Sequence, residues 1–254
     1  MQFNNVASRN GIIQLIEKTT KLGLGTISGN AAPDYYLDYF TVLVNNWNGY
    51  FTTTIQRISG EATYDDVNNT GFATERYSSV NDQQDYGIDT DISATRMMEI
   101  RDATEADTDK GFSTIPFIEF KDRVSNRFGQ TSGTPTGWWM EGRSFIFDVP
   151  IDTAKIDIYR ATYDRHASAF ATSDTTKTPG FDSQFHPGLY YGPSLEWATI
   201  QGKAEVIALC KEMLYGVSPE MPGVIKLMKK QYKNQIKELN PKVGRKQTSG
   251  GSWA

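Results

Sequence analysis

The sequence predicts an α+β fold in which helices from both ends of the chain form one antiparallel bundle and an antiparallel β domain is inserted between them. Long amphipathic stripes lie near both ends, the middle is rich in Thr, Asp and Gly, and a basic, Gly/Ser-containing segment follows the last stripe. Amphipathic helices bury their apolar stripes most simply against each other. We therefore expect a helical bundle from residues 1–59 and 189–240, a β-rich domain over 60–188 and an extended C-terminal arm over 241–254.

Two helices are predicted in the first sixty residues. The first begins near Ser8, a candidate N-cap, and ends after Leu22. The second begins near Pro33 and ends at Ser59. Its apolar residues recur at intervals of three and four, which places them in one stripe: Leu37, Phe40, Val44, Trp47, Phe51 and Ile55.

Two more helices are predicted near the C-terminus. One begins at the candidate N-cap Ser194 and ends at Gly216, and the other ends before Pro241. The apolar stripe of the first consists of Trp197, Ile200, Ala204, Ile207, Cys210 and Leu214. The stripe of the second consists of Ile225, Met228, Tyr232, Ile236 and Leu239, with most lysines on other faces.

Several short strands are predicted between the helices. They cover residues 96–100, 112–120, 138–140, 143–147 and 155–163. Glu141-Gly142 is a two-residue hairpin signal, and Ile156 and Ile158 alternate with polar residues. Short strands at this spacing predict a sandwich or a small barrel.

Composition limits the classes of protein that fit. The chain has 254 residues, of which 38% are hydrophobic and 22% charged, enough to form a sizeable core. Cys210 is the single cysteine, so neither an intrachain disulfide nor a thiolate metal cluster can form. We recognise no signal peptide and no apolar run of membrane-spanning length, and we expect a soluble protein with no membrane contact.

Charge is distributed unevenly along the chain. Residues 60–110 hold 13 Asp and Glu against 4 Lys and Arg, a net charge of −9. Residues 221–254 hold 8 Lys and Arg against 1 Glu, a net charge of +7. This asymmetry indicates contact between unlike surfaces, either of neighbouring copies or of different partners. The alternative is that both segments are simply solvated faces.

We predict no catalytic residue, no cofactor and no metal site. His166 follows Asp164 by two residues and could act as a general base with this acidic partner. An isolated pair of this kind is a weak signal of catalysis. The acidic segment 99–110 lacks the full pattern of a calcium loop, which leaves cation binding open. Trp138 and Trp139 are suited to sugar stacking, but sheet packing explains them more simply.

The segment after Pro241 is predicted to be an arm that becomes ordered on another protein. It is basic, contains glycine and ends near a tryptophan, and it has no apolar stripe of its own. The candidate contact residues are Lys242, Arg245, Lys246 and Trp253. Two alternatives remain: a frayed terminus without a partner, and a nucleic-acid contact that the last helix shares.

A series of short motifs occurs in a fixed order through the middle of the chain. Ala-Thr-Tyr-Asp-Asp-Val-Asn-Asn occupies residues 62–69, and Asn-Asp-Gln-Gln-Asp-Tyr-Gly-Ile occupies residues 81–88. Gly-Thr-Pro-Thr-Gly-Trp-Trp follows at 133–139 and Phe-His-Pro-Gly-Leu-Tyr-Tyr-Gly at 185–192. In this order the motifs resemble those of the head-to-tail adaptor (connector) proteins of tailed bacteriophages, over roughly residues 9–233.

The resemblance implies a structural protein of the virion neck that is assembled in the host cytoplasm. It implies a homo-oligomeric, commonly dodecameric ring beneath the portal protein, which extends the DNA channel and carries the next tail component. DNA would pass through without sequence-specific contacts. The resemblance also implies that the C-terminal arm binds the portal. Two other functions stay open: a carbohydrate-binding or hydrolysing virion protein, and a nucleic-acid-binding protein.

Overall fold

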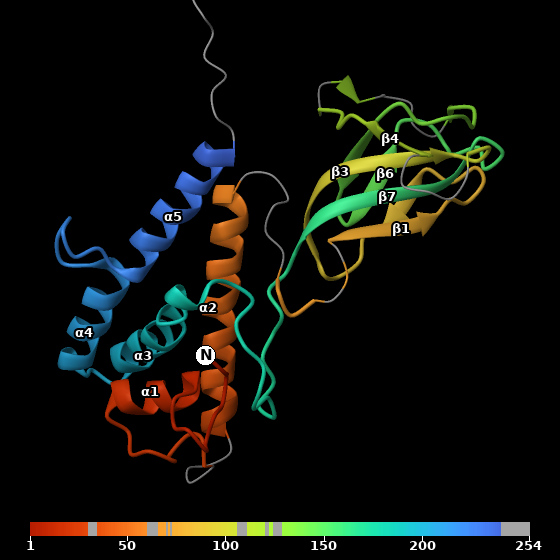
Figure 1. Cartoon of the computed structure of the whole chain (residues 1–254). Coiled ribbons are helices and arrows are strands. Elements are labelled where there is room, and N and C mark those ends of the chain that lie inside the picture. Colours follow the sequence, from red (N-terminus) through yellow and green to blue (C-terminus); the bar gives the residue numbers. More distant parts are fainter. Residues whose placement is uncertain are drawn as a thin grey trace, which may run out of the picture.

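The computed structural model describes residues 1–29, 35–59, 66–69, 71, 73–105, 111–119, 122–123 and 129–239, with no side-chain description for residues 35 and 234–239. Within these ranges the protein is α+β, with five α-helices and two antiparallel sheets (Figure 1). The strands all lie between the second and third helices in the sequence. The α+β class is as predicted, whereas the predicted helix start at Pro33 and the arm over 241–254 lie outside the described residues.

The helices are α1 (Ile12–Thr20), α2 (Tyr35–Ser59), α3 (Gly188–Ile200), α4 (Ala204–Tyr215) and α5 (Val224–Leu239). The strands are β1 (Thr74–Ser78), β2 (Asp85–Gly87), β3 (Ile92–Asp102), β4 (Phe112–Ile115), β5 (Trp138–Glu141), β6 (Ser144–Phe147) and β7 (Ile156–Arg165). A short 3₁₀ helix, Ser183–Phe185, precedes α3. None of the helices in the described ranges combines the length and apolarity needed to cross a membrane.

Side chains from all five helices share one hydrophobic cluster. The predicted stripe of α2 faces this cluster, with Phe40, Val44, Phe51 and Ile55 fully buried. The described part of the α5 stripe is buried in the same cluster. The spacing of apolar residues was therefore a correct guide to the buried faces of these two helices.

The start of α1 was predicted wrongly. The helix is capped at Gly11, and Ser8 lies in a preceding turn. That turn is closed by Asn5, whose side-chain oxygen accepts the Ser8 N–H at 2.9 Å and whose carbonyl accepts the Arg9 N–H at 2.9 Å. Ser8 is thus part of a turn that Asn5 holds before the helix begins.

The single helix predicted from Ser194 to Gly216 is also wrong, because the chain forms two helices there. The first, α3, starts earlier and contains Pro193 in its interior, and Ile200 at its end is 71% exposed. Gly202 then adopts a left-handed conformation, with φ +64°, before α4 begins. Glycine tolerates this conformation without the steric cost that other residues meet, so the chain changes direction at this point.

The two sheets pack around a second hydrophobic cluster. One sheet has the strand order β1-β7-β3-β4 and the other has the order β2-β6-β5. Tyr159 is central, because its ring stacks on Tyr77 with centroids 5.0 Å apart and meets the edges of Tyr86 and Phe147. Among the described residues the sheet cluster and the helix cluster have no side chain in common.

A bulge changes the predicted face of one β7 residue. Ile156 is buried, but Ile158 is only partly buried although it lies two positions along the strand. The pairing shifts by one residue between Arg101 and Asp102 of β3, which are opposite Ile158 and Ile156. Such an irregularity interrupts the alternation of side chains between the two faces of the strand. The prediction that Ile156 and Ile158 lie on the same face assumed an uninterrupted alternation.

The hairpin between β5 and β6 is one residue out of the predicted register. Its two-residue loop is Gly142-Arg143, because Glu141 pairs with Ser144. Gly142 has φ +61°, as expected for glycine at the first central position of a tight hairpin turn.

Charged residues cover part of the other face of the four-stranded sheet. Arg160 Nε lies 2.8 Å from Glu99 Oε2, and the same guanidinium lies 4.1 Å from the centre of the Phe112 ring. Arg101 pairs with Asp157, which lowers the pKa of that carboxyl. These cross-strand pairs join β3, β4 and β7.

The close approach of α2 and α3 generates a prediction. A Cβ added at Gly188 would lie 2.1 Å from Phe51 Cζ, in the helix cluster. Gly188→Ala is therefore expected to lower the free energy of unfolding by about 1–3 kcal/mol through overpacking. Gly49→Ala is the control, since the space at that position is open and alanine favours the helix by about 0.5–1 kcal/mol. Urea denaturation monitored by circular dichroism measures both, and equal effects of the two substitutions would contradict the prediction.

Candidate interaction surfaces and the junction between the two cores

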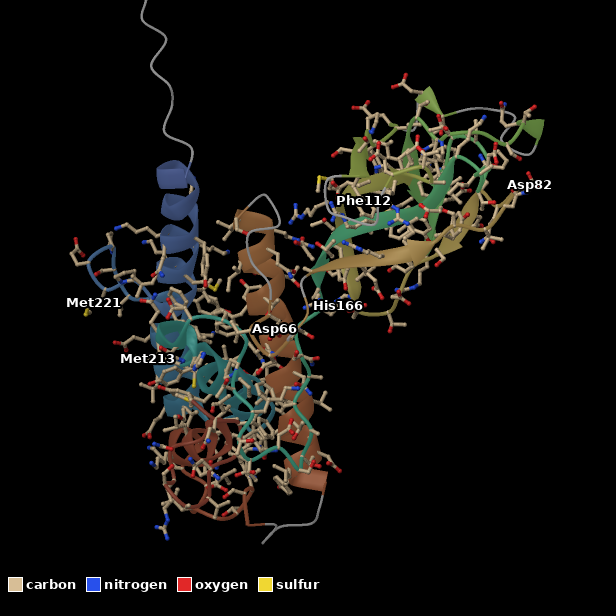
Figure 2. The ribbon with its side chains drawn as sticks, turned by 45° about the vertical axis from the view of Figure 1, so that its right-hand side comes forward. Asp66, Asp82, Phe112, His166, Met213 and Met221 are labelled. Atoms are coloured by element: carbon tan, nitrogen blue, oxygen red, sulfur yellow. The ribbon has the colours of Figure 1, made fainter. Side chains whose placement is uncertain are left out.

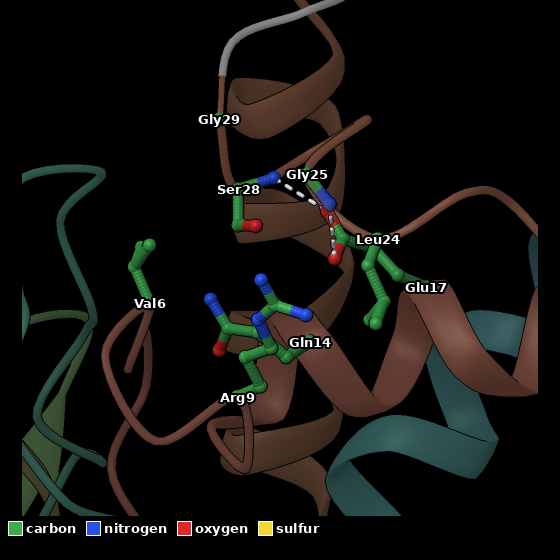
Figure 3. A pocket seen from close by; sticks show the side chains of 8 residues that line it. All are labelled: Val6, Arg9, Gln14, Glu17, Leu24, Gly25, Ser28 and Gly29. Carbon is green, nitrogen blue, oxygen red and sulfur yellow. Dashed lines mark hydrogen bonds between the residues drawn. The ribbon is translucent and has the colours of Figure 1, made fainter.

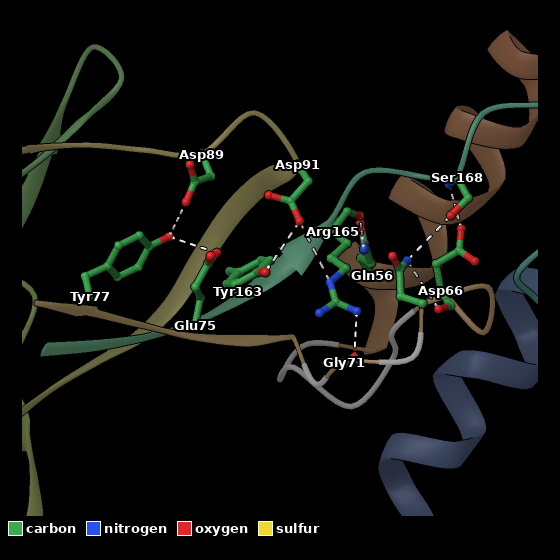
Figure 4. Close-up of polar contacts among 11 residues, drawn as sticks. Gln56, Asp66, Gly71, Glu75, Tyr77, Asp89, Asp91, Tyr163, Arg165 and Ser168 are labelled. Carbon is green, nitrogen blue, oxygen red and sulfur yellow. Dashed lines mark hydrogen bonds and ion pairs between the residues drawn. The ribbon is translucent and has the colours of Figure 1, made fainter.

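A polar junction connects the helices to the sheets, and Gln56 near the end of α2 lies at its centre (Figure 4). Gln56 is 3% exposed, and its Nε2 donates to the carbonyl of Arg165 at 2.7 Å. The backbone carbonyl of Gln56 accepts a hydrogen bond from Arg96 Nη2 at 3.1 Å. One residue of α2 therefore contacts both central strands, since Arg96 belongs to β3 and Arg165 ends β7.

Further polar contacts surround this residue. Arg165 Nη1 donates to the carbonyl of Gly71 at 2.8 Å, and Arg165 Nε lies 4.0 Å from Asp91 Oδ2. Arg96 Nε donates to the buried carboxylate of Asp164 at 2.8 Å. Charge-assisted bonds of this kind are stronger and more directional than neutral ones.

Asp66 organises the other side of the junction. It is 1% exposed, and its Oδ1 accepts the Asn68 N–H at 2.9 Å while its Oδ2 accepts the Ser168 N–H at 2.7 Å. A Cβ added at Gly180 would lie 2.0 Å from Asp66 Oδ1, so a larger residue at that position would displace the carboxylate. The Asp-Val-Asn order at 66–68 is typical of an Asx turn, the signal from which this role was predictable.

The weak catalytic and sugar-binding candidates gain no support from the geometry. Asp164 is bonded to Arg96, and His166 is exposed on the loop after β7. Trp138 and Trp139 are 3% and 1% exposed, so neither ring offers a face for stacking on a sugar. Cys210 is buried as expected for a small apolar residue, and burial raises the pKa of its thiol to about 11.

No group of three or more His, Cys, Asp or Glu residues in the part of the chain that the structure describes is arranged to hold a metal ion. In the acidic segment 99–110, Glu105 is described and exposed, and residues 106–110 lie outside the described ranges.

A small cavity of about 160 Å³ lies beside α1 (Figure 3). Glu17 contributes to its wall and is fully buried. Its Oε1 accepts the N–H groups of Ile27 and Ser28, each at 2.7 Å, and its Oε2 accepts that of Gly25 at 3.0 Å. Both carboxylate oxygens thus hold the loop after α1, which makes Glu17 a structural residue of this loop.

His186 is a further buried titratable group for which the sequence predicted no role. It is 3% exposed, and its Nε2 lies 2.9 Å from the carbonyl of Phe181. Burial lowers the pKa of its imidazole. This residue belongs to the 185–192 motif that leads into α3, and its contacts fix the entry into that helix.

An exposed apolar surface lies on α4, α5 and their connection, which we call the α4–α5 face. Met213 and Met221 lie on the side of the helical part that faces away from the sheets (Figure 2). Met221 is 59% exposed, a large fraction for a side chain of its type. The members of the face are Leu209, Met213, Tyr215, Val217, Met221 and Leu227. Exposed apolar side chains gathered on neighbouring elements are typical of surfaces that contact other molecules.

Lysines border the α4–α5 face along α5. Each of these lysines has another three or four residues away along the helix, so together they form a stripe on its exposed side. The exposed lysines that the structure describes there are Lys226, Lys229, Lys230 and Lys233. The candidate arm residues Lys242, Arg245, Lys246 and Trp253 follow this helix but lie outside the described ranges.

The junction generates a second prediction. Gln56→Ala leaves the Arg165 carbonyl without its side-chain donor, and a buried acceptor of this kind costs about 1–3 kcal/mol. We expect faster amide hydrogen exchange around residues 165–168 together with a lower free energy of unfolding. Arg57→Ala alters the adjacent, exposed residue and is expected to change neither quantity by more than about 0.5 kcal/mol. Unchanged exchange in the Gln56 variant would contradict the assigned role.

His186 generates a third prediction, on pH dependence. Its folded-state pKa is below the ordinary value of 6.5, so in acid the unfolded chain binds a proton that the folded chain excludes. The contribution of His186 to stability is complete above about pH 6.5 and is lost as the pH falls toward the folded-state pKa. We expect His186→Gln to remove a slope of up to about 1.4 kcal/mol per pH unit below pH 6.5, measured by urea denaturation. His166→Gln, at an exposed site, is expected to keep the slope, and an identical slope in both variants would refute the assignment.

Comparisons with family models and with curated proteins find no match to this chain, and the adaptor resemblance of its motifs therefore stays a prediction.

Proposed function

We propose that this protein is a structural subunit of the neck of a tailed-bacteriophage virion. In this proposal identical copies form a ring, commonly dodecameric in the resembling proteins, beneath the portal protein. The ring extends the DNA channel, connects the head to the next tail or neck component, and catalyses no reaction. Its location is the virion, after assembly in the host cytoplasm, and DNA passes through it without sequence-specific contacts.

The observation that carries the proposal is that the chain has two separate hydrophobic cores, which are connected by a polar junction. Helices from both ends of the chain share one core, and strands from the middle share the other. This supports the arrangement that the motifs imply, a helical bundle interrupted by an inserted β domain. The Asp66 turn and the His186 entry into α3 lie within two of those motifs and hold structural positions in the junction and the bundle.

The C-terminal arm is the proposed portal contact. Lys242, Arg245, Lys246 and Trp253 combine positive charge with one large aromatic side chain, a composition suited to binding a protein surface on ordering. The preceding helix α5 is anchored in the helix core through Ile225, Met228 and Tyr232. Because α5 is anchored, the position from which the arm extends is expected to stay fixed when the arm binds its partner.

The lysine stripe of α5 favours a second candidate function, nucleic-acid binding. Exposed lysines at helical spacing neutralise phosphates, and the affinity then falls steeply with salt. In this second proposal the isolated chain binds duplex DNA, and removal of residues 241–254 weakens that binding. Unchanged DNA affinity after the truncation would count against it.

The leading proposal predicts both assembly and portal binding. We expect electron microscopy and mass photometry of the chain mixed with the portal protein of its phage to detect rings attached to the portal. Truncation after residue 240 is expected to weaken portal affinity at least tenfold, because the arm is lost while the described fold is kept. Lys203→Glu, an exposed change on the loop before α4, is the control. A full-length chain that stays monomeric and ignores the portal would overturn the proposal.

A further inference from the structure

The end of the β part that lies farthest from the helices is acidic. Asp102 pairs with Ile156 at one end of the β3–β7 ladder, whereas Ile92 pairs with Arg165 at the junction end. Asp82 lies at the same distant end (Figure 2).

Backbone hydrogen bonds hold three turns together at this distant end. The Ala103 N–H donates to the Lys155 carbonyl at 2.7 Å, and the Asp82 N–H donates to the Ile151 carbonyl at 2.9 Å. We call this end the β tip and define it by six charged residues within the described ranges: Asp82, Asp85, Asp102, Glu105, Asp152 and Lys155. Five carboxylates and one lysine give it a net charge of −4.

The β tip and the α4–α5 face complement each other chemically. The four exposed lysines of α5 that the structure describes carry a charge of +4, and Leu227, which is 45% exposed, lies on the same helix one turn from Lys230. The tip carries a charge of −4, and Val80, two residues before Asp82, has a side chain that is 52% exposed. Opposite charge steers two surfaces together and fixes their register, while apolar burial supplies affinity.

The two surfaces lie on opposite sides of the molecule, with the sheets on one side and α5 on the other (Figures 1 and 2). One copy is therefore unable to bring its own tip onto its own α4–α5 face while the fold is kept. A second copy can supply the tip. A contact between two different surfaces of identical chains repeats from copy to copy and closes into a ring when the rotation allows it.

We propose that the α4–α5 face is the docking site for the β tip of a neighbouring copy. This inference rests on the proposed ring and names the surfaces that form it. The lysine stripe binds the tip carboxylates, and Leu227 and its apolar neighbours cover Val80. The charge asymmetry of the sequence, acidic in the middle and basic toward the C-terminus, thus becomes a contact between successive subunits.

The test uses two sets of charge changes in the full-length chain. The tip variant carries Asp82→Asn, Asp85→Lys and Glu105→Lys, which change the net charge of the tip from −4 to +1. Asparagine is chosen at position 82 because Asp82 has φ +61°, a conformation that asparagine tolerates. The α5 variant carries Lys226→Glu, Lys229→Glu and Lys233→Glu, which change the charge of the stripe from +4 to −2.

Sedimentation velocity at low salt is expected to find that each variant alone self-associates at least tenfold more weakly than the unaltered chain. An equimolar mixture is expected to regain assembly, because every contact then joins surfaces of opposite charge. Arg57→Glu with Lys203→Glu, placed at other exposed positions, is expected to assemble normally. Carbodiimide cross-linking of isotopically mixed copies is expected to join tip carboxylates to α5 lysines between chains.

Two results would overturn the inference. If both variants assemble like the unaltered chain, or the cross-links join other surfaces, the docking site is wrong and the ring remains. If the unaltered chain is monomeric at every concentration and with the portal protein, the ring and the docking site both fall.

Discussion

The structure depends on the way in which Gln56 joins α2 to the sheets. A buried amide side chain must satisfy its hydrogen bonds, and here the partner is the carbonyl at the end of β7. The backbone carbonyl of Gln56 accepts a hydrogen bond from Arg96 of β3. Because β3 and β7 pair along their length, fixing their near ends fixes the direction of the whole sheet. A change of a few degrees at this residue would move the distant end of the β part by several ångströms, so the precision of that end is set at the junction.

The sequence allowed prediction of the features that repeat along a single element. The apolar stripes of α2 and α5 follow the helical period, and the aromatic and β-branched residues of β5–β7 mark strands. It did not allow prediction of features that need a partner from elsewhere. The break between α3 and α4 depends on Gly202 in a left-handed conformation, and the face of Ile158 depends on a shift in pairing with β3. Neither feature changes the spacing of apolar residues in its own segment, so neither could be predicted from that spacing.

The candidate sites followed the same division. Lysines on α5 were predictable as an exposed stripe, because charge and helical spacing can be read directly from the residues. Glu17 was not identified, since its partners are backbone amides of the loop that follows its helix. The Asx-turn pattern at 66–68 marks the bond from Asp66 to Asn68, but not the bond that Asp66 accepts from the distant Ser168. A search of a sequence for chemistry looks for pairs of side chains, such as His166 with Asp164. Two buried carboxylates, Glu17 and Asp66, instead stabilise loops, and the carboxylate of Asp164 pairs with Arg96.

The antiparallel pairing of β3 with β7 has a consequence for how this architecture can vary. The two strands enter and leave the junction side by side, and their other ends are joined to turns at the β tip. Adding two residues to each strand at that end would lengthen the β part by about 7 Å while keeping the inward and outward faces of every residue. The contacts of Gln56 would stay unchanged. The span of the chain can therefore evolve in discrete steps, independently of the helical part, and under the proposed assembly one helical scaffold would give rings of different circumference.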